Sequence, residues 1–94
     1  MLDITIGEKS EILLSGRFDA SQVETARSIF DPINESKIVD FTELDYISSA
    51  GLGVLLMTQK RLKDNGHQLI LQNLNKHVRE VFKYAGFDMI FKIE

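Results

Sequence analysis

Segments with apolar residues at every second position alternate along this chain with segments that have them at every third or fourth position. This pattern limits the possible folds more than any other feature of the sequence. At the start, Leu2, Ile4 and Ile6 alternate with polar residues, which is the period of a half-buried strand. Between Ala20 and Phe30 the apolar residues instead recur at every third or fourth position, as on one face of a helix. Strands that alternate with helices predict an α/β domain with a mostly parallel sheet.

The rest of the chain continues this alternation. The expected elements are strands at residues 2–6 and 11–15, a helix from residue 20 to near Pro32, a strand at 37–41, a helix from the serines at 48 and 49 to Asn65, a strand at 68–72, a helix at 75–86 and a strand at 89–93. Gly16 is expected to end the second strand. We therefore expect one domain, residues 1–94, with a mixed, mostly parallel sheet in the order strand, strand, helix, strand, helix, strand, helix, strand. Right-handed connections would place the helices mainly on one face.

The amino-acid composition limits the cellular compartments and the classes of partner that fit this chain. The chain has no cysteine, so it offers no disulfide, thiolate nucleophile or cysteine-bound metal. Neither a signal peptide nor an apolar run of roughly 18 residues is present, so we expect a cytoplasmic protein without direct membrane insertion. The formal charge is -3 and the basic residues are scattered, which argues against binding of nucleic acid.

Patterns typical of enzymes and metal sites are incomplete. A hydrolase nucleophile elbow around Ser49 would need glycine where Ile47 stands, and a dinucleotide fingerprint would need glycine at Leu56. His67 and His77 are ten positions apart, lack the spacing of metal ligands, and are expected to be surface residues. The sequence therefore predicts no enzyme, no metal and no cofactor.

Three carboxylates, Asp40, Glu43 and Asp45, follow one another between the third strand and the second predicted helix. They are expected to belong to a solvated loop, with contacts to a partner as the main alternative. Acid/base chemistry or a divalent cation would also use such residues.

The stretch S-S-A-G-L-G, residues 48–53, opens the second helix with small residues. One serine would serve as the helix cap, worth roughly 1 kcal/mol, while each glycine costs the helix about 1 kcal/mol. The helix start is therefore expected to be bare, and its free amides and positive macrodipole end tolerate an anion. A phosphate on Ser49 would add nearly two negative charges there.

These motifs resemble those of the STAS domains, in particular the bacterial anti-sigma factor antagonists. The similarity covers nearly the whole chain and includes L-S-G-R-F-D at residues 14–19 and I-V-D-F-T-E-L-D-Y-I-S-S-A-G-L-G-V-L-L at residues 38–56. The resemblance implies that Ser49, two places before Gly51, is the phosphoacceptor. Ser48 stands where members often have aspartate, which makes Ser48 the alternative acceptor.

The resemblance further implies partner switching. The unmodified antagonist would bind an anti-sigma factor, usually a serine kinase of the GHKL type, and so free a sigma factor; phosphorylation would break the complex, and a PP2C-like phosphatase would restore it. The expected partner-binding residues are Asp19, Ser48, Ser49, Ala50, Gly51, Leu52 and Gly53. Asp19 is expected either to meet a basic residue of the partner or to cap the first helix. The alternative function is a non-phosphorylated scaffold subunit of a lipid or anion transport system, where the serines act only as caps.

Overall fold

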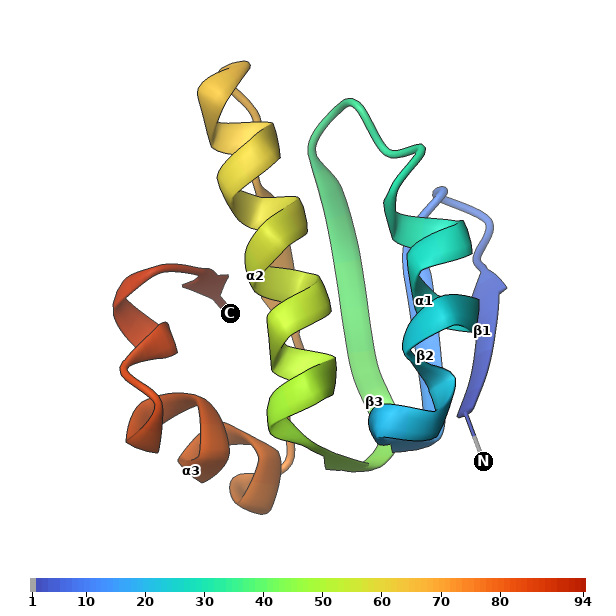
Figure 1. The fold of residues 1–94 in the computed structure, drawn as a ribbon, viewed down its shortest axis with the longest axis vertical. Coiled ribbons are helices and arrows are strands. Elements are labelled where there is room, and N and C mark those ends of the chain that lie inside the picture. Colours follow the sequence, from blue (N-terminus) through green and yellow to red (C-terminus); the bar gives the residue numbers. More distant parts are fainter. Residues whose placement is uncertain (1) are drawn as a thin grey trace.

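The computed structural model describes residues 2–94, which form a five-stranded sheet in the order β1-β2-β3-β4-β5 (Figure 1). The strands are β1 (Leu2–Ile6), β2 (Ile12–Phe18), β3 (Lys37–Ile47), β4 (Leu69–Gln72) and β5 (Lys92–Ile93). The helices are α1 (Val23–Phe30), α2 (Ser49–Asp64) and α3 (Lys76–Tyr84), with short 3-10 turns η1 (Ala20–Gln22) and η2 (Phe87–Met89). β1 pairs antiparallel with β2 and the other neighbours pair parallel, so the predicted α/β fold is confirmed.

The strand order explains where the helices lie. From β2 to β5 each connection moves one strand further in the same direction, and right-handed crossovers then place α1, α2 and α3 over the same face. Figure 1 shows α1 and α2 side by side over the sheet, with α3 beyond α2. Phe82 of α3 makes edge-on contacts with Phe41 and Phe91, at centroid distances of 5.9 and 5.7 Å, which bring α3 into the same core.

Two strands are longer than the sequence predicts. β2 passes through Gly16 and ends at Phe18, and β3 continues beyond Phe41 to Ile47. The ladder shifts register between Gly16 and Arg17, where Gly16 has a φ of 92°, so this glycine marks a bulge and not a strand end. Such shifts break the alternating period that identifies a strand from sequence.

The three carboxylates therefore lie on β3 and not in a loop, which corrects the sequence-based expectation. Glu43 and Asp45 are exposed there, while Asp40 accepts hydrogen bonds from the backbone N–H of Thr42 at 2.8 Å and from the side chain of Asn73 at 3.2 Å. Burial alone would raise the pKa of Asp40, but these hydrogen bonds outweigh it and hold that pKa below its ordinary value. Asp40 thus ties β3 to the segment after β4.

The last predicted strand, residues 89–93, is also shorter in the structure. Only Lys92–Ile93 pairs with β4, and the residues before it form η2 after Gly86, whose φ is 75°. The N–H groups of Ile90 and Phe91 both donate to the carbonyl of Phe87. Apolar residues at positions i, i+3 and i+4 indicate a helical turn, and this local spacing prevails over the strand-like composition.

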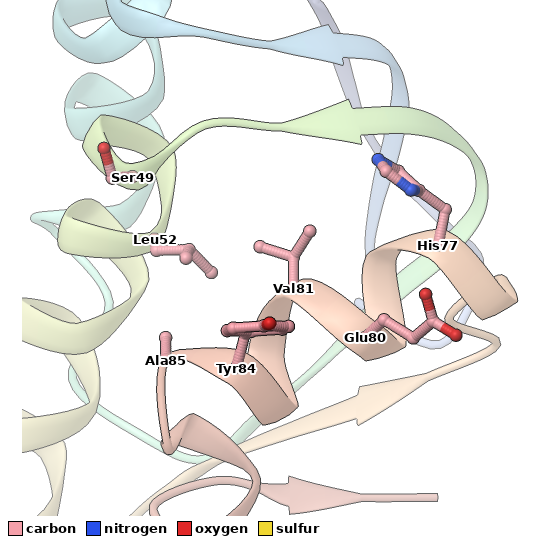
Figure 2. A pocket seen from close by; sticks show the side chains of 7 residues that line it. All are labelled: Ser49, Leu52, His77, Glu80, Val81, Tyr84 and Ala85. Carbon is pink, nitrogen blue, oxygen red and sulfur yellow. The ribbon is translucent and has the colours of Figure 1, made fainter.

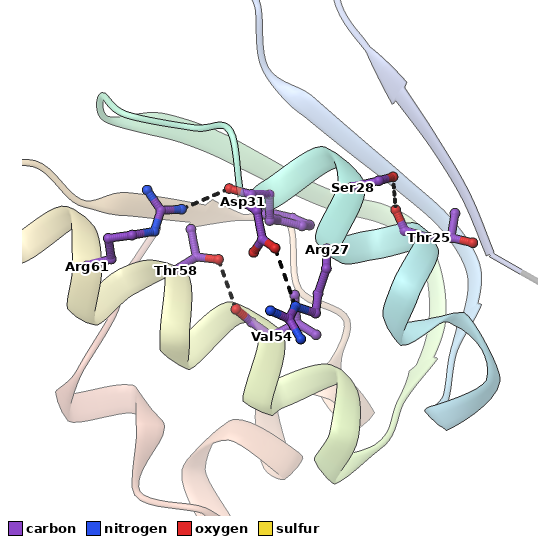
Figure 3. Close-up of polar contacts among 8 residues, drawn as sticks. Thr25, Arg27, Ser28, Asp31, Val54, Thr58 and Arg61 are labelled. Atoms are coloured by element: carbon purple, nitrogen blue, oxygen red, sulfur yellow. Dashed lines mark hydrogen bonds and ion pairs between the residues drawn. The ribbon is translucent and has the colours of Figure 1, made fainter.

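Two polar side chains hold α2 in place. Arg61 donates to the carbonyl oxygen of Phe30, the last residue of α1, at 3.0 Å and to that of Ile33 in the loop after it at 2.5 Å. Figure 3 shows Arg61 reaching from α2 to the end of α1. The fully buried Gln59 accepts from the N–H of Leu69 at 2.7 Å and donates to the carbonyl of Ile90 at 2.9 Å. Because both ends of this buried amide are satisfied, α2 is fixed against β4 and the segment before β5. No helix within residues 2–94 has both the length and the hydropathy needed to cross a membrane.

Candidate functional site

Ser48 is the N-cap of α2. Its backbone N–H donates to the carbonyl of Phe18 at 2.9 Å, and its side-chain oxygen accepts from the N–H of Gly51 at 3.2 Å. The N–H of Leu52 donates to the Ser48 carbonyl at 2.9 Å, which starts the helical ladder. The half-buried Ser48 hydroxyl thus satisfies an amide that would otherwise lack a partner.

Ser49 occupies the first helical position and has a different environment. Its side chain is exposed and makes no hydrogen bond with any other part of residues 2–94. The first turn of α2 also contains no acidic residue. Of the two adjacent hydroxyls, Ser48 is therefore used by the fold and Ser49 is accessible from solvent.

This assignment makes a stability prediction. Ser48→Ala should lower the free energy of unfolding by about 1 kcal/mol through loss of the cap, whereas Ser49→Ala should change it by less than about 0.5 kcal/mol. Urea denaturation followed by circular dichroism measures both variants. A loss confined to Ser49→Ala would show that the cap has been assigned to the wrong serine.

The two glycines of the first turns have different surroundings. A Cβ added to Gly51 would lie 2.9 Å from Cγ1 of Ile47 and 3.0 Å from Cδ1 of Phe18, so α2 can approach the ends of β2 and β3 only with glycine there. A Cβ added to Gly53 would meet no heavy atom within 4 Å. Packing within the domain thus requires Gly51, while Gly53 leaves open space on the outside of the helix.

A hollow of about 470 Å³ lies between the start of α2 and α3, beside Ser49 (Figure 2). It is lined by Ser49, Leu52, His77, Glu80, Val81, Tyr84 and Ala85. Leu52 and Val81 supply apolar walls, and Tyr84 is 96% exposed next to them. Ser49 and His77 lie at opposite ends of this hollow in Figure 2. An exposed tyrosine beside apolar walls is typical of a protein contact surface.

The sequence reasoning missed the α3 side of this hollow. It placed the predicted site residues Ser48, Ser49, Ala50, Gly51, Leu52 and Gly53 together, and the structure does so because they are consecutive at one helix start. It did not foresee that Val81 and Tyr84 would face them. The available signal was Tyr84 itself, an aromatic residue in the otherwise charged surface of the third helix.

Asp19 caps the first helical segment. Its carboxylate accepts from the N–H and the hydroxyl of Ser21 at 2.9 and 2.6 Å, and its own N–H donates to Oε1 of Gln22 at 3.2 Å, which completes a capping box. The hydrogen bonds from Ser21 hold the pKa of Asp19 below its ordinary value, so this side chain is ionised at neutral pH. Because Phe18 bonds to Ser48, Asp19 lies directly beside the start of α2. Contact with a partner stays a prediction.

The site offers an exposed hydroxyl beside an apolar hollow. Within residues 2–94 no group of three or more histidine, cysteine, aspartate or glutamate side chains is placed to hold a metal ion. His67 is half-buried and His77 exposed, and neither is hydrogen-bonded to Ser49 in the described part of the chain. In the described part of the chain the Ser49 hydroxyl therefore has no hydrogen-bonded base beside it of the kind that activates a nucleophilic serine.

Residues 2–94 thus define a small α/β domain in which a bare helix start lies beside an apolar hollow. A family model described as "Mlab, STAS domain" matches residues 5–93, so the chain belongs to the STAS domain family. This confirms the family that the sequence motifs suggested.

Two curated relatives support the same classification. BtrV of Bordetella bronchiseptica, assigned as an anti-sigma factor antagonist, is 42% identical over 76 residues, which cover 80% of this chain and 66% of that protein. The anti-sigma-B factor antagonist of Listeria monocytogenes is 28% identical over 89 residues, covering 89% of this chain and 77% of that protein. This chain is thus similar to proteins named as anti-sigma factor antagonists.

Solved structures share the fold. The anti-sigma factor antagonist SpoIIAA in its unphosphorylated form aligns with a TM-score of 0.75 and 20% identity, covering 100% of this chain and 88% of the other. SpoIIAA of Bacillus in the phosphorylated form aligns with a TM-score of 0.70, also at 20% identity, covering 100% and 91% of the two chains. The predicted fold class is confirmed by these alignments.

Proposed function

We propose that this chain is an anti-sigma factor antagonist whose partner binding is switched by phosphorylation of Ser49. The observation that carries the proposal is that the two adjacent serines have different structural roles. Ser48 caps α2 through Gly51, whereas Ser49 is exposed at the rim of the hollow. The serine free to react therefore stands where a partner would dock.

The electrostatics at Ser49 favour a switch that leaves the domain folded. A phosphate there would sit at the positive end of the α2 macrodipole, in a first turn without acidic residues. Within its own domain the phosphate is thus tolerated. A partner that covered this surface would instead bury nearly two negative charges, at a penalty of several kcal/mol unless it supplied a basic group.

The partner surface in this proposal combines the helix start with the hollow. Gly53 permits close approach of the partner because nothing in the domain occupies the space beside it. Leu52 and Val81 receive apolar side chains, and Tyr84 supplies an exposed aromatic contact. Asp19, ionised beside the same helix start, pairs with a basic residue of the partner.

The family resemblance is what supports the partners in this proposal. The proposed binder is an anti-sigma factor that is also a serine kinase of the GHKL type, and a PP2C-like phosphatase reverses the modification. ATP, magnesium and the catalytic base belong to the kinase, so this chain performs no catalysis itself. The switch operates in the cytoplasm, where the sigma factor that it frees acts.

Phosphorylation itself tests this proposal. Incubation with ATP and a GHKL-type serine kinase of the same organism that binds the chain should yield one phosphate, located on Ser49 by tandem mass spectrometry. The Ser48→Ala variant should be phosphorylated like the wild type, and Ser49→Ala should not be labelled. Phosphate found on Ser48 in the wild-type protein would contradict the assignment.

A second candidate is a scaffold subunit of a lipid or anion transport system that is never phosphorylated. It is favoured by Ser48, an uncharged cap where STAS antagonists often carry aspartate. This candidate predicts that no kinase labels Ser49 and that charge at Ser49 leaves partner binding unchanged.

A further inference from the structure

A second hollow, of about 530 Å³, lies on the other flank of α3, between this helix and the edge strand β5. It is lined by Arg79, Lys83, Asp88, Phe91, Lys92 and Ile93. None of these residues lines the hollow beside Ser49. We propose that this hollow, called here the basic groove, docks an extended acidic peptide segment of a partner protein, at a place separate from Ser49.

The charges of the basic groove select an acidic ligand. Arg79 and Lys83 lie one helical turn apart and have no ion-pair partner in the described part of the chain. Lys92 is paired with Glu94 at 3.5 Å, and Asp88 is the one carboxylate among the lining residues. Two unpaired cations in a chain of net charge -3 form a local binding site for carboxylates, which guanidinium and ammonium groups bind through charge-assisted hydrogen bonds.

The backbone of β5 favours an extended peptide over other anions. Glu94 donates its N–H to the carbonyl of Leu71 at 2.8 Å, and Leu71 stands opposite Ile93 in the ladder. Because backbone groups alternate along a strand, the N–H and C=O of Ile93 point away from β4, and the sheet has no strand beyond β5 within residues 2–94. An added peptide strand would hydrogen-bond to these groups.

The shape of the basic groove excludes a polynucleotide as the preferred ligand. Nucleic acid backbones are bound by cations spread along an extended path, whereas these cations surround one hollow. Its apolar surface comes from Phe91, which is almost fully buried, and Ile93, which is half-buried. A peptide that carries both acidic and apolar side chains matches both components, because the cations bind its carboxylates and the apolar lining receives its aliphatic groups.

The two flanks of α3 separate this site from the phosphorylation site. His77, Glu80 and Tyr84 line the hollow beside Ser49, while Arg79 and Lys83 line the basic groove. Lys83 also borders a shallow hollow with Glu80 and Tyr84, so Arg79 is the cation set furthest from the Ser49 surface. A peptide in the basic groove therefore stays bound in either phosphorylation state of Ser49. It would hold a partner near the domain after the Ser49 surface has released it.

The test uses the full chain and a short synthetic peptide that alternates glutamate and valine, with a glutamine-for-glutamate peptide as its control. Isothermal titration calorimetry gives the affinity, and amide chemical shifts locate the peptide. We expect shifts at Arg79, Lys83 and Ile93, and at least a tenfold loss of affinity in the Arg79→Glu/Lys83→Glu double variant. The matched Lys60→Glu/Lys63→Glu variant on the exposed face of α2 should bind within twofold of wild type.

Further outcomes decide the proposal. N-methylation of alternate peptide amides, which blocks strand pairing but keeps the charges, should weaken binding at least fivefold, and Ser49→Asp should leave it within twofold. Equal binding of the glutamine peptide, equal loss in both double variants, or displacement of the peptide by a short RNA at lower concentration would each overturn the proposal. Failure here would leave the phosphorylation of Ser49 untouched, since that is measured separately by mass spectrometry.

Discussion

Replacing Ser49 with aspartate is expected to weaken binding of the kinase anti-sigma factor on the order of a hundredfold, and Ser49→Ala to leave the dissociation constant within about threefold. Aspartate places a carboxylate on the surface that the partner covers, and a buried charge without its own cation costs several kcal/mol. Alanine adds no charge and removes only an exposed hydroxyl. Surface plasmon resonance with immobilised kinase measures both variants.

The aspartate variant needs a control for folding and for unspecific repulsion. A carboxylate in the first turn of α2 is favourable with the helix macrodipole, so Ser49→Asp should unfold at the same or slightly higher denaturant concentration than wild type. Ser28→Asp on α1 places the same charge at another exposed serine and should bind like wild type. Wild-type affinity of Ser49→Asp would show that charge at this position does not control the partner.

Alanine substitutions at Gly51 and Gly53 should change stability in opposite directions. At Gly51 the new methyl would overlap Ile47 and the fully buried Phe18, and overpacking of this kind costs about 1 to 3 kcal/mol. The better helix propensity of alanine returns about 1 kcal/mol, so the net loss is about 0 to 2 kcal/mol. At Gly53 nothing opposes the methyl, and a gain of about 0.5 to 1 kcal/mol is expected.

Measuring how the two glycine variants bind the partner is more informative than measuring their stability. If Gly53 is kept bare for close approach of the partner, Gly53→Ala should be more stable than wild type in urea denaturation yet bind the kinase at least tenfold more weakly. Gly51→Ala tests whether a destabilised but folded domain still binds. A Gly53→Ala variant that is stabilised and binds normally would mean that this glycine has no part in the interface.

The sequence predicted the fold well where one physical signal acted alone. The alternation of strand and helix periods gave the element order, and Asn75 and Gly86 correctly marked the ends of α3, since Asn75 accepts from the N–H of Val78 at 2.8 Å and Gly86 adopts a φ of 75°. At Asn65 and Gly66 the turn signal likewise ended α2 correctly. The hydrophobic periodicity and the helix-end residues depend only on neighbours in the sequence, so they can be recognised without the structure.

Prediction failed where tertiary pairing decided the structure. The second half of β3, up to Ile47, lacks a regular alternation, and it becomes a strand because β2 pairs with it through two register shifts. The pairing of β2 with β3 is not visible in a local window, since it depends on a segment distant in the sequence. The segment before β5 is a different case: its helical turn follows the local spacing of Phe87, Ile90 and Phe91, which the strand-like composition of residues 89–93 obscured.

Part of the candidate site could be predicted from local sequence, and part of it depends on tertiary packing. The residues at 48–53 are neighbours in sequence and were found together, but which serine caps the helix depends on the register of Ser48 against Phe18. The contribution of Val81 and Tyr84 depends on how α3 packs beside α2, which periodicity does not specify. Local motifs thus identified the candidate helix start, and only the fold showed that Val81 and Tyr84 lie beside it.

The most direct measurement compares the unmodified chain with the chain stoichiometrically phosphorylated on Ser49. Isothermal titration calorimetry against the kinase anti-sigma factor should show about a thousandfold weaker binding for the phosphorylated form, which corresponds to about 4 kcal/mol. The PP2C-like phosphatase should restore the original affinity in the same sample. Equal affinities of the two forms would contradict the central claim that Ser49 phosphorylation controls the partner.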